Sequence, residues 1–240
     1  MRLVNVTAMP RTVFITGTDT GVGKTLVTAA LAATLMRLGH RVAVYKPTQA
    51  GLENGSGDID IVRKLTEADV EEGVRLPHPM APVAAAKLAG VTLPTAAEHV
   101  TAIRRLGATH DHILVEGAGG ILVELDESGN TLADIATATA DDADTDDTTT
   151  AALVVCRAAL GTLNHTALTI EALAGRGIGI LGMVIGSWPD QPTPVELSNR
   201  EYLARHAVPL LGAIPEQSGT LGPMQFRAAA ENWLYTSRLI

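Results

Sequence analysis

Cysteine, basic charge and long apolar runs are all scarce in this chain of 240 residues. The single cysteine, Cys156, excludes an intrachain disulfide framework and a cysteine-rich metal site, which fits a reducing cytosol. Lys and Arg number 18 against 26 Asp and Glu, and no basic cluster favours nucleic acid or an anionic membrane as a partner. No run reaches the roughly 18 apolar residues of a membrane span. The first ten residues lack the apolar core of a signal peptide, so we expect a cytoplasmic protein.

The length and composition fit one compact domain. With 240 residues, 46% of them hydrophobic, the chain can bury a sizeable core without a second domain. We expect residues 1–10 to form a frayed N-terminal extension and residues 11–240 to form the domain. Within residues 138–150, five aspartates lie among threonines and alanines: Asp141, Asp142, Asp144, Asp146 and Asp147. Their spacing lacks the glycine turn and distal glutamate of a calcium loop, so we expect a solvated, mobile loop there.

Apolar runs alternate with helix-like segments along the chain. The runs suited to buried strands are residues 13–15, 42–45, 113–115, 153–156, 180–185 and 209–214. The segments suited to helices are residues 26–37, 59–65, 96–106, 164–174 and 194–205. This alternation predicts an α/β fold in which helices flank a mostly parallel sheet.

Residues 12–25, TVFITGTDTGVGKT, form the most informative motif. Its three glycines free the backbone so that N–H groups can converge on phosphate oxygens, and a helix beginning near Lys24 directs its positive end toward them. Lys24 is then expected to reach the β- and γ-phosphates, and the Thr25 hydroxyl to bind magnesium. The glycine spacing is one residue longer than the common pattern. Its place between a strand and a helix nevertheless favours a phosphate-binding loop, and hence a P-loop NTPase-like fold, over a structural turn.

Three charged side chains are expected near the triphosphate, because open α/β sheets bind ligands at the carboxyl ends of their strands. Lys46 follows the second strand and is a candidate to contact the transferring phosphoryl group, although a lone lysine at a strand end more commonly extends into water. Glu116 ends the strand HILVE and is either a magnesium ligand or a cap for the next turn. Asp58 is either a further magnesium ligand or a helix N-cap.

Residues 160–173, LGTLNHTALTIEAL, predict the start of a helix after the fourth strand. Gly161 provides a tight turn there, and Thr162 or Asn164 provides the cap. The free N–H groups of such a helix are able to hold an anion.

Five motifs, in this order and spacing, resemble the dethiobiotin synthetase family. They are residues 17–25 (GTDTGVGKT), 45–47 (YKP), 115–120 (VEGAGG), 161–166 (GTLNHT) and 211–215 (LGAIP). The resemblance implies a homodimeric cyclo-ligase that uses ATP and Mg²⁺ to join CO2 to 7,8-diaminopelargonate. A carbamate forms first, the γ-phosphoryl group of ATP converts it to a carbamic-phosphoric anhydride, and ring closure gives dethiobiotin, ADP and phosphate.

The resemblance also implies roles for the residues at matching positions. Lys24 and Lys46 are the implied catalytic residues, and Thr25, Asp58 and Glu116 the implied metal ligands. The implied nucleotide-binding residues are Thr20, Gly21, Val22, Gly23, Lys24, Thr25, Asp58, Glu116, Gly117, Ala118, Gly119, Gly186, Ser187, Ile214, Pro215 and Glu216. The implied substrate-binding residues are Thr20, Lys46, Gly117, Gly119, Gly161, Thr162, Leu163 and Asn164, of which the last four receive the carboxylate tail of a diamine bound to the neighbouring subunit.

Two positions depart from the family pattern. Ala50 stands where the family commonly has a Ser or Thr that contacts the substrate, so that Thr48, Gln49 or a backbone N–H substitutes, or the contact is absent. Gly186 and Ser187 stand where the family often has an asparagine that hydrogen-bonds to adenine. Loss of that amide relaxes or alters the choice of base, so other nucleoside triphosphates could serve.

Two other functions share the phosphate loop. A partition or septum-positioning switch ATPase carries a lysine early in the loop, where this chain has Asp19. It also usually needs a basic face or an amphipathic tail, which residues 228–240 do not provide. A cobyrinate-type amide synthetase ordinarily carries a glutaminase domain, for which 240 residues leave no room.

Overall fold

The computed structural model of the protein describes residues 9–52, 55–141 and 150–235. Over these residues, seven parallel strands form one sheet in the order β3-β2-β4-β1-β5-β6-β7. The strands are β1 (Thr12–Gly17), β2 (Val42–Ala50), β3 (Asp69–Leu76), β4 (His112–Gly120), β5 (Thr150–Cys156), β6 (Gly179–Trp188) and β7 (Leu210–Pro215). The helices are α1 (Lys24–Arg37), α2 (Asp58–Thr66), α3 (Pro82–Ala89), α4 (Ala96–Gly107), α5 (Leu132–Asp141), α6 (Thr162–Ala174), α7 (Pro194–Ala204) and α8 (Pro223–Ala230), with a 3-10 turn at Ser218–Thr220.

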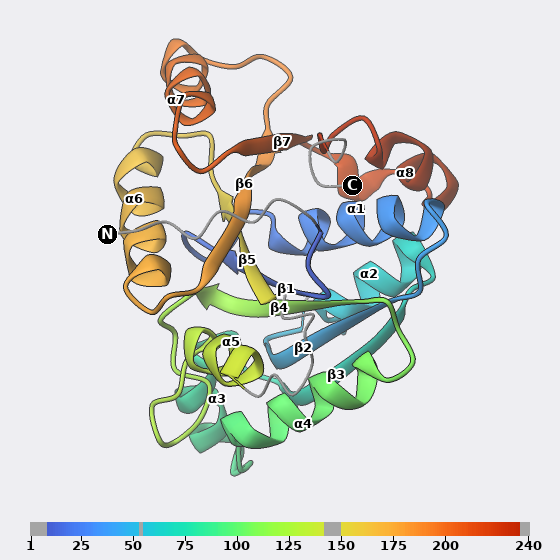
Figure 1. Ribbon diagram of the computed structural model, residues 1–240, viewed down its shortest axis with the longest axis vertical. Coiled ribbons are helices and arrows are strands. Elements are labelled where there is room, and N and C mark those ends of the chain that lie inside the picture. Colours follow the sequence, from blue (N-terminus) through green and yellow to red (C-terminus); the bar gives the residue numbers. More distant parts are fainter. Residues whose placement is uncertain (1–8, 53–54, 142–149, 236–240) are drawn as a thin grey trace.

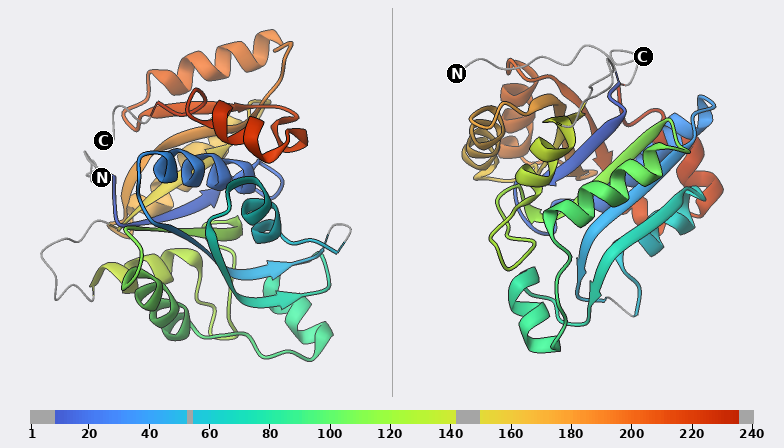
Figure 2. Two further views of the ribbon diagram at one scale, coloured as in Figure 1. Left: turned by 90° about the vertical axis from the view of Figure 1, so that its right-hand side faces the viewer. Right: turned by 60° about the horizontal axis from the view of Figure 1, so that its bottom comes forward.

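Two layers of helices cover the sheet (Figure 1 and Figure 2). Helices α1, α2 and α8 pack on one face, where Val27, Val62 and Phe226 join the side chains of the strands in one apolar core. Helices α4, α5, α6 and α7 contribute to a second core on the other face. Both faces of the sheet are therefore buried, which explains why the central strands consist of continuous apolar runs instead of alternating residues.

The predicted fold class is confirmed, and each of the six predicted strands and five predicted helices coincides with an element of the structure. The sequence patterns missed β3, α3, α5 and α8. Two strands are also longer than predicted, since β2 continues to Ala50 and β4 to Gly120. Lys46 and Glu116 therefore lie inside strands and not just beyond them, as was expected.

Some expectations fall partly outside the described residues. Of the extension expected over residues 1–10, residues 1–8 are not described, whereas Pro10 is buried and its carbonyl oxygen accepts a hydrogen bond of 2.8 Å from Nδ1 of His112. Of the acidic loop expected near residues 138–150, residues 142–149 lie outside the described part. Residues 138–141 are the last turn of α5, and Thr150 begins β5, so those positions are not loop. Among the helices of the described ranges, none combines the length and apolarity that a membrane crossing requires.

The chain order of the strands reverses around β1. The connection through α1 leads from β1 to β2 on one side of the sheet, and the connection through α5 leads from β4 to β5 across β1 to the other side. In open α/β sheets, ligands bind at such a switch point, beyond the carboxyl ends of the strands. The predicted phosphate loop, which joins β1 to α1, lies at this point.

Candidate active site

The phosphate loop is held in place by close backbone packing. Gly23 precedes α1 with a left-handed φ of 95°, and a Cβ atom there would lie 2.2 Å from the carbonyl oxygen of Gly186. No side chain caps the helix start, so the first N–H groups of α1 point into the loop without a capping oxygen. Arg157, just beyond β5, pairs with the Asp19 carboxylate at 2.6 Å and anchors the outer part of the loop. The loop thus presents a helix N-terminus suited to an anion.

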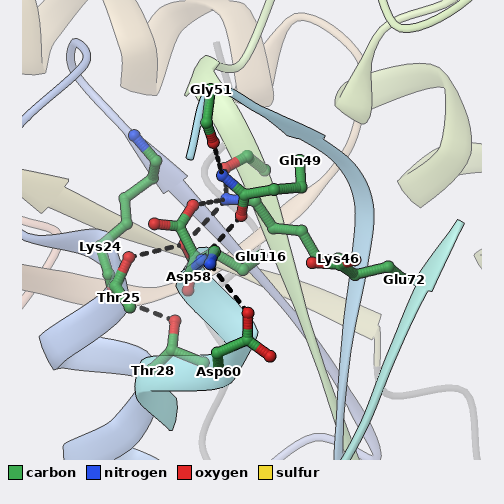
Figure 3. A network of polar contacts seen from close by, with 12 residues as sticks. Lys24, Thr25, Thr28, Lys46, Gln49, Gly51, Asp58, Asp60, Glu72 and Glu116 are labelled. Carbon is green, nitrogen blue, oxygen red and sulfur yellow. Dashed lines mark hydrogen bonds and ion pairs between the residues drawn. The ribbon is translucent and has the colours of Figure 1, made fainter. Parts of the chain in front are cut away.

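Lys46 lies at the centre of the site. Its side chain is only 2% exposed, and its Nζ donates hydrogen bonds to Oε1 of Glu116 at 2.9 Å and to the carbonyl oxygen of Gly117 at 3.1 Å. Nζ also lies 2.5 Å from Oδ2 of Asp58 (Figure 3). The alternative that Lys46 extends into water is therefore wrong. The lysine reaches across the site from β2 and joins β4 to the start of α2.

The charges of this cluster keep one another ionised. Burial alone would lower the pKa of Lys46, but the carboxylates of Glu116 and Asp58 raise it above its usual range. Burial likewise opposes ionisation of Asp58, yet the ammonium group of Lys46 holds the pKa of that carboxyl below its usual range. The pKa of Lys24 is lowered by its own burial and by the nearby positive charge of Lys46. Two ammonium groups therefore face the same space, an arrangement that favours an anionic ligand between them.

Thr25, Asp58 and Glu116 form a set of oxygen donors beside the loop. The Thr25 hydroxyl donates a hydrogen bond of 3.0 Å to Oε1 of Glu116, while Oε2 of the same carboxylate is buried and has no hydrogen-bond partner among the described residues. A hydroxyl and two carboxylates match the oxygen ligands that Mg²⁺ prefers. The described residues contain no cluster of three or more His, Cys, Asp or Glu that could hold a metal ion, which suits an ion that also uses phosphate oxygens and water.

Asp58 is the first residue of α2 and not its cap. Gly57 holds the N-cap position, and its N–H donates to Oδ2 of Asp60 at 2.8 Å. The N–H of Asp58 donates to Oε1 of Gln49 at 2.7 Å. The N-cap alternative for Asp58 is therefore wrong, and its carboxylate stays free to face Lys46.

A cavity of about 940 Å³ opens over this cluster. Its polar and charged lining includes Thr20, Lys24, Thr25, Lys46, Thr48, Asp58 and Glu116. Its apolar lining includes Leu52, Pro77, Pro79, Met80 and Pro82, which we call the apolar wall. A ligand that combines charged groups with an aliphatic chain fits such a cavity.

The segment after Glu116 approaches the phosphate loop closely because it is rich in glycine. Gly119 has a left-handed φ of 67°, and a Cβ there would lie 3.4 Å from the Thr20 hydroxyl. A Cβ at Gly117 would lie 2.5 Å from Cδ2 of Leu132. Ala118 and Gly119 line the cavity together with Thr20, Gly21 and Gly23, as predicted for a nucleotide site.

Other predicted site residues lie away from the cavity. A Cβ at Gly186 would lie 2.0 Å from the carbonyl oxygen of Val22, so this glycine supports the back of the loop. Ser187 is exposed beyond it near the end of β6. Ile214 and Pro215 end the neighbouring β7, and the N–H of Glu216 donates to the carbonyl oxygen of Trp188 at 2.7 Å. Among the described residues, these five positions form a separate ledge beside the loop.

The start of α6 is also remote from the cavity within one chain. Gly161 itself holds the N-cap position, with a φ of 92°, and no side chain caps the helix. The expectation that Thr162 or Asn164 acts as the cap is therefore wrong. Thr162 is buried, Leu163 is half-buried, and Asn164 is exposed. The uncapped start leaves backbone N–H groups available, as expected for an anion site.

The sequence patterns missed two features of the site. The apolar wall comes mainly from residues 77–82, PHPMAP, whose closely spaced prolines were the available signal. Gln49 positions the start of α2 through its bond to the Asp58 N–H, and its amide nitrogen also donates to the carbonyl oxygen of Gly51 at 2.9 Å. A glutamine in a strand gives no sign of that task.

Comparison with solved structures supports the fold. The chain superposes on chloroplast FtsY from Physcomitrella patens with a TM-score of 0.56 and 16% identity, covering 95% of this chain and 68% of that one. FlhF in complex with GTP and Mg²⁺ gives a TM-score of 0.54 and 14% identity, covering 94% and 75%. At this level of identity, the likeness concerns the fold alone.

Sequence comparison identifies the family. The model of an AAA domain family matches residues 11–223. The ATP-dependent dethiobiotin synthetase of Mycobacterium avium (strain 104) is 47% identical, over 90% of this chain and 92% of its own length. That of Parafrankia sp. (strain EAN1pec) is 48% identical over 92% and 90%, and that of Mycobacterium tuberculosis (strain ATCC 25177 / H37Ra) 46% identical over 92% and 96%. These relatives favour the synthetase over the switch ATPase. The chain belongs to the ATP-dependent dethiobiotin synthetase family.

Proposed function

We propose that this protein is an ATP-dependent dethiobiotin synthetase that closes the ureido ring of dethiobiotin from 7,8-diaminopelargonate and CO2. The observation that carries the proposal is the buried Lys46, held between Glu116 and Asp58 beside the phosphate-loop residues Lys24 and Thr25. The reaction develops negative charge on a carbamate and on a transferring phosphoryl group, so that fixed positive charge is what the protein must supply. Formation of dethiobiotin from these substrates, detected by mass spectrometry, is the test.

The residues of the cluster have separate tasks in this proposal. Lys24 and the N–H groups at the start of α1 bind the β- and γ-phosphates of ATP. Lys46 holds the carbamate and the γ-phosphoryl group in contact and stabilises the charge that passes between them. Thr25, Asp58 and Glu116 are the residues that would hold Mg²⁺, which when bound neutralises charge on the phosphates. The apolar wall binds the aliphatic chain of the diamine and excludes water from the anhydride.

The base of the nucleotide is the less constrained part of the proposed site. Gly186 and Ser187 offer no side-chain amide that reads adenine by accepting and donating at once. We expect GTP and CTP to support diamine-dependent phosphate release with kcat/KM within about tenfold of that for ATP, because one lost base contact costs about 1.4 kcal/mol or less. A preference for ATP of more than a hundredfold, measured under identical conditions, contradicts this part of the proposal.

We further propose a homodimer in which the start of α6 receives the carboxylate of the diamine bound to the other subunit. Asn164 and Leu168 are exposed, one helical turn apart on the same face of α6, and Leu168 is 56% exposed. Leu160, just before Gly161, is 83% exposed. An apolar face of this kind beside an uncapped helix start suits a subunit contact.

The dimer is tested by placing a charge on that face. The wild-type protein is expected to sediment at twice the 25.0 kDa of one chain, whereas Leu168→Glu is expected to sediment as a monomer with a KM for the diamine raised at least tenfold. Leu38→Glu, at an exposed leucine after α1, serves as the matched control and should behave as wild type. A wild-type protein that stays monomeric at micromolar concentration while turning over normally rules out the shared site.

A further inference from the structure

Thr48 is a buried polar residue in the wall of the cavity. It lies two residues beyond Lys46 on β2, so that both side chains project from the same face of the strand. The residue is 1% exposed and lines the cavity, yet its hydroxyl has no hydrogen-bond partner in the part of the chain that the structure describes. A buried hydroxyl without a partner costs free energy unless a ligand supplies the missing hydrogen bond.

The other groups at this end of β2 are already occupied. The amide nitrogen of Gln49 donates to the carbonyl oxygen of Gly51, and its Oε1 accepts from the N–H of Asp58. The N–H of Gly51 donates to the carbonyl oxygen of Leu76 at 3.0 Å. Ala50 offers only a methyl group. Among the alternatives for a polar substrate contact here, the Thr48 hydroxyl therefore keeps its full bonding capacity.

The position of Thr48 suits the junction between the two ends of the diamine. On one side along β2 is Lys46, which belongs to the charged cluster. On the other side is Gly51, where a Cβ would lie 2.7 Å from Cβ of Pro79 in the apolar wall. Strand residues two apart are separated by about 7 Å, the length of a few carbon–carbon bonds. A molecule with its amines near Lys46 and its chain along the apolar wall therefore passes Thr48 near its amine-bearing carbons.

We infer that Thr48 is a substrate-positioning residue whose hydroxyl binds the amine-bearing end of the diamine. A hydroxyl is both donor and acceptor, so it accepts from an amino group and donates to a carbamate oxygen once the carbamate has formed. The inference rests on the proposed function, because it assigns a contact to the substrate of that reaction. It explains how the site orients its diamine although residue 50 is an alanine.

The test compares two substitutions that differ in the hydroxyl. Thr48→Val keeps the shape and removes the hydroxyl, and we expect it to raise the KM for 7,8-diaminopelargonate at least tenfold while the KM for ATP stays within twofold. Thr48→Ser keeps the hydroxyl and should stay within about threefold of wild type on both substrates. Thr34→Val, at an equally buried threonine whose hydroxyl bonds inside α1, is the matched control and should leave both KM values unchanged.

A structural role for Thr48 is separated by a measurement on the resting protein. Because the hydroxyl has no partner among the described residues, Thr48→Val should unfold at a temperature no lower than wild type. Calorimetric titration with the diamine should show the same loss of affinity as the KM. Equal binding of the diamine by wild type and Thr48→Val, or a lowered unfolding temperature with both KM values raised together, overturns the inference alone. A wild type that neither binds nor turns over the diamine overturns the proposed function and this inference with it.

Discussion

Replacement of Lys46 by alanine is expected to lower kcat by about 10³-fold and to leave the affinity for ATP within about threefold. The ammonium group is buried and charged between Glu116 and Asp58, and it is the cation that faces the carbamate in the proposed site. Its contribution is greatest where charge moves during phosphoryl transfer, so the loss appears in kcat. ATP keeps Lys24 and the start of α1. Single-turnover kinetics and calorimetric binding of a non-hydrolysable ATP analogue measure the two effects separately.

The same substitution also affects stability, which the experiment must control. Removal of one partner from a buried ion pair costs about 3–5 kcal/mol because the remaining carboxylates face each other without a cation. Lys46→Met keeps most of the side-chain volume and should show the same loss of kcat as the alanine variant. Lys64→Ala, at an exposed lysine of α2, should have wild-type activity. Near-normal turnover by a folded Lys46 variant removes this lysine from the chemistry.

Replacement of Gly23 by alanine is expected to abolish measurable ATP binding and to lower turnover by at least about 10²-fold. The residue has a φ of 95°, and a Cβ would lie 2.2 Å from the carbonyl oxygen of Gly186, which is backbone and cannot swing aside. The loop must therefore shift, and its N–H groups lose their alignment on the phosphates. Calorimetry with ATP and Mg²⁺ measures the loss of binding.

Gly39 provides a control at the other end of α1. Its φ is 92°, but a Cβ there would meet no described atom within 4 Å. Gly39→Ala should thus cost only the backbone term, about 1 kcal/mol of unfolding free energy, with normal turnover. If both variants lose the same stability and neither loses ATP binding, the contact between Gly23 and Gly186 does not shape the phosphate site.

The central strands were predictable because both of their faces are buried, and the edge strand was not. β3 reads DVEEGVRL, in which half of the residues are charged, and it pairs only with β2 at the edge of the sheet. Its charges are used on the surface, where Glu72 and Asp60 both bind Arg75. No apolar run marks such a strand. Short helices such as α3 and α8, of eight residues each, likewise give little periodicity to detect.

The residues of the site were predictable from local motifs, but their arrangement was not. The phosphate loop is contiguous, and Lys24 and Thr25 lie where the motif predicts. The burial of Lys46, in contrast, depends on Glu116, 70 residues away, and on Asp58 at the start of another helix. Its role in the chain's own chemistry could be proposed from sequence, yet a surface lysine was an equally consistent outcome until those contacts were known. The orphan hydroxyl of Thr48 also becomes visible only in three dimensions.

The most direct test of the proposed function is the dependence of phosphate release on the diamine. Purified protein is incubated with ATP, Mg²⁺ and bicarbonate, with and without 7,8-diaminopelargonate, and released phosphate is followed continuously. We expect release only when the diamine is present, with one dethiobiotin formed for each phosphate, because the anhydride cannot form before the carbamate. Release at the same rate without the diamine, or no release with any nucleoside triphosphate, would contradict the assignment of this site to the closure of the ureido ring.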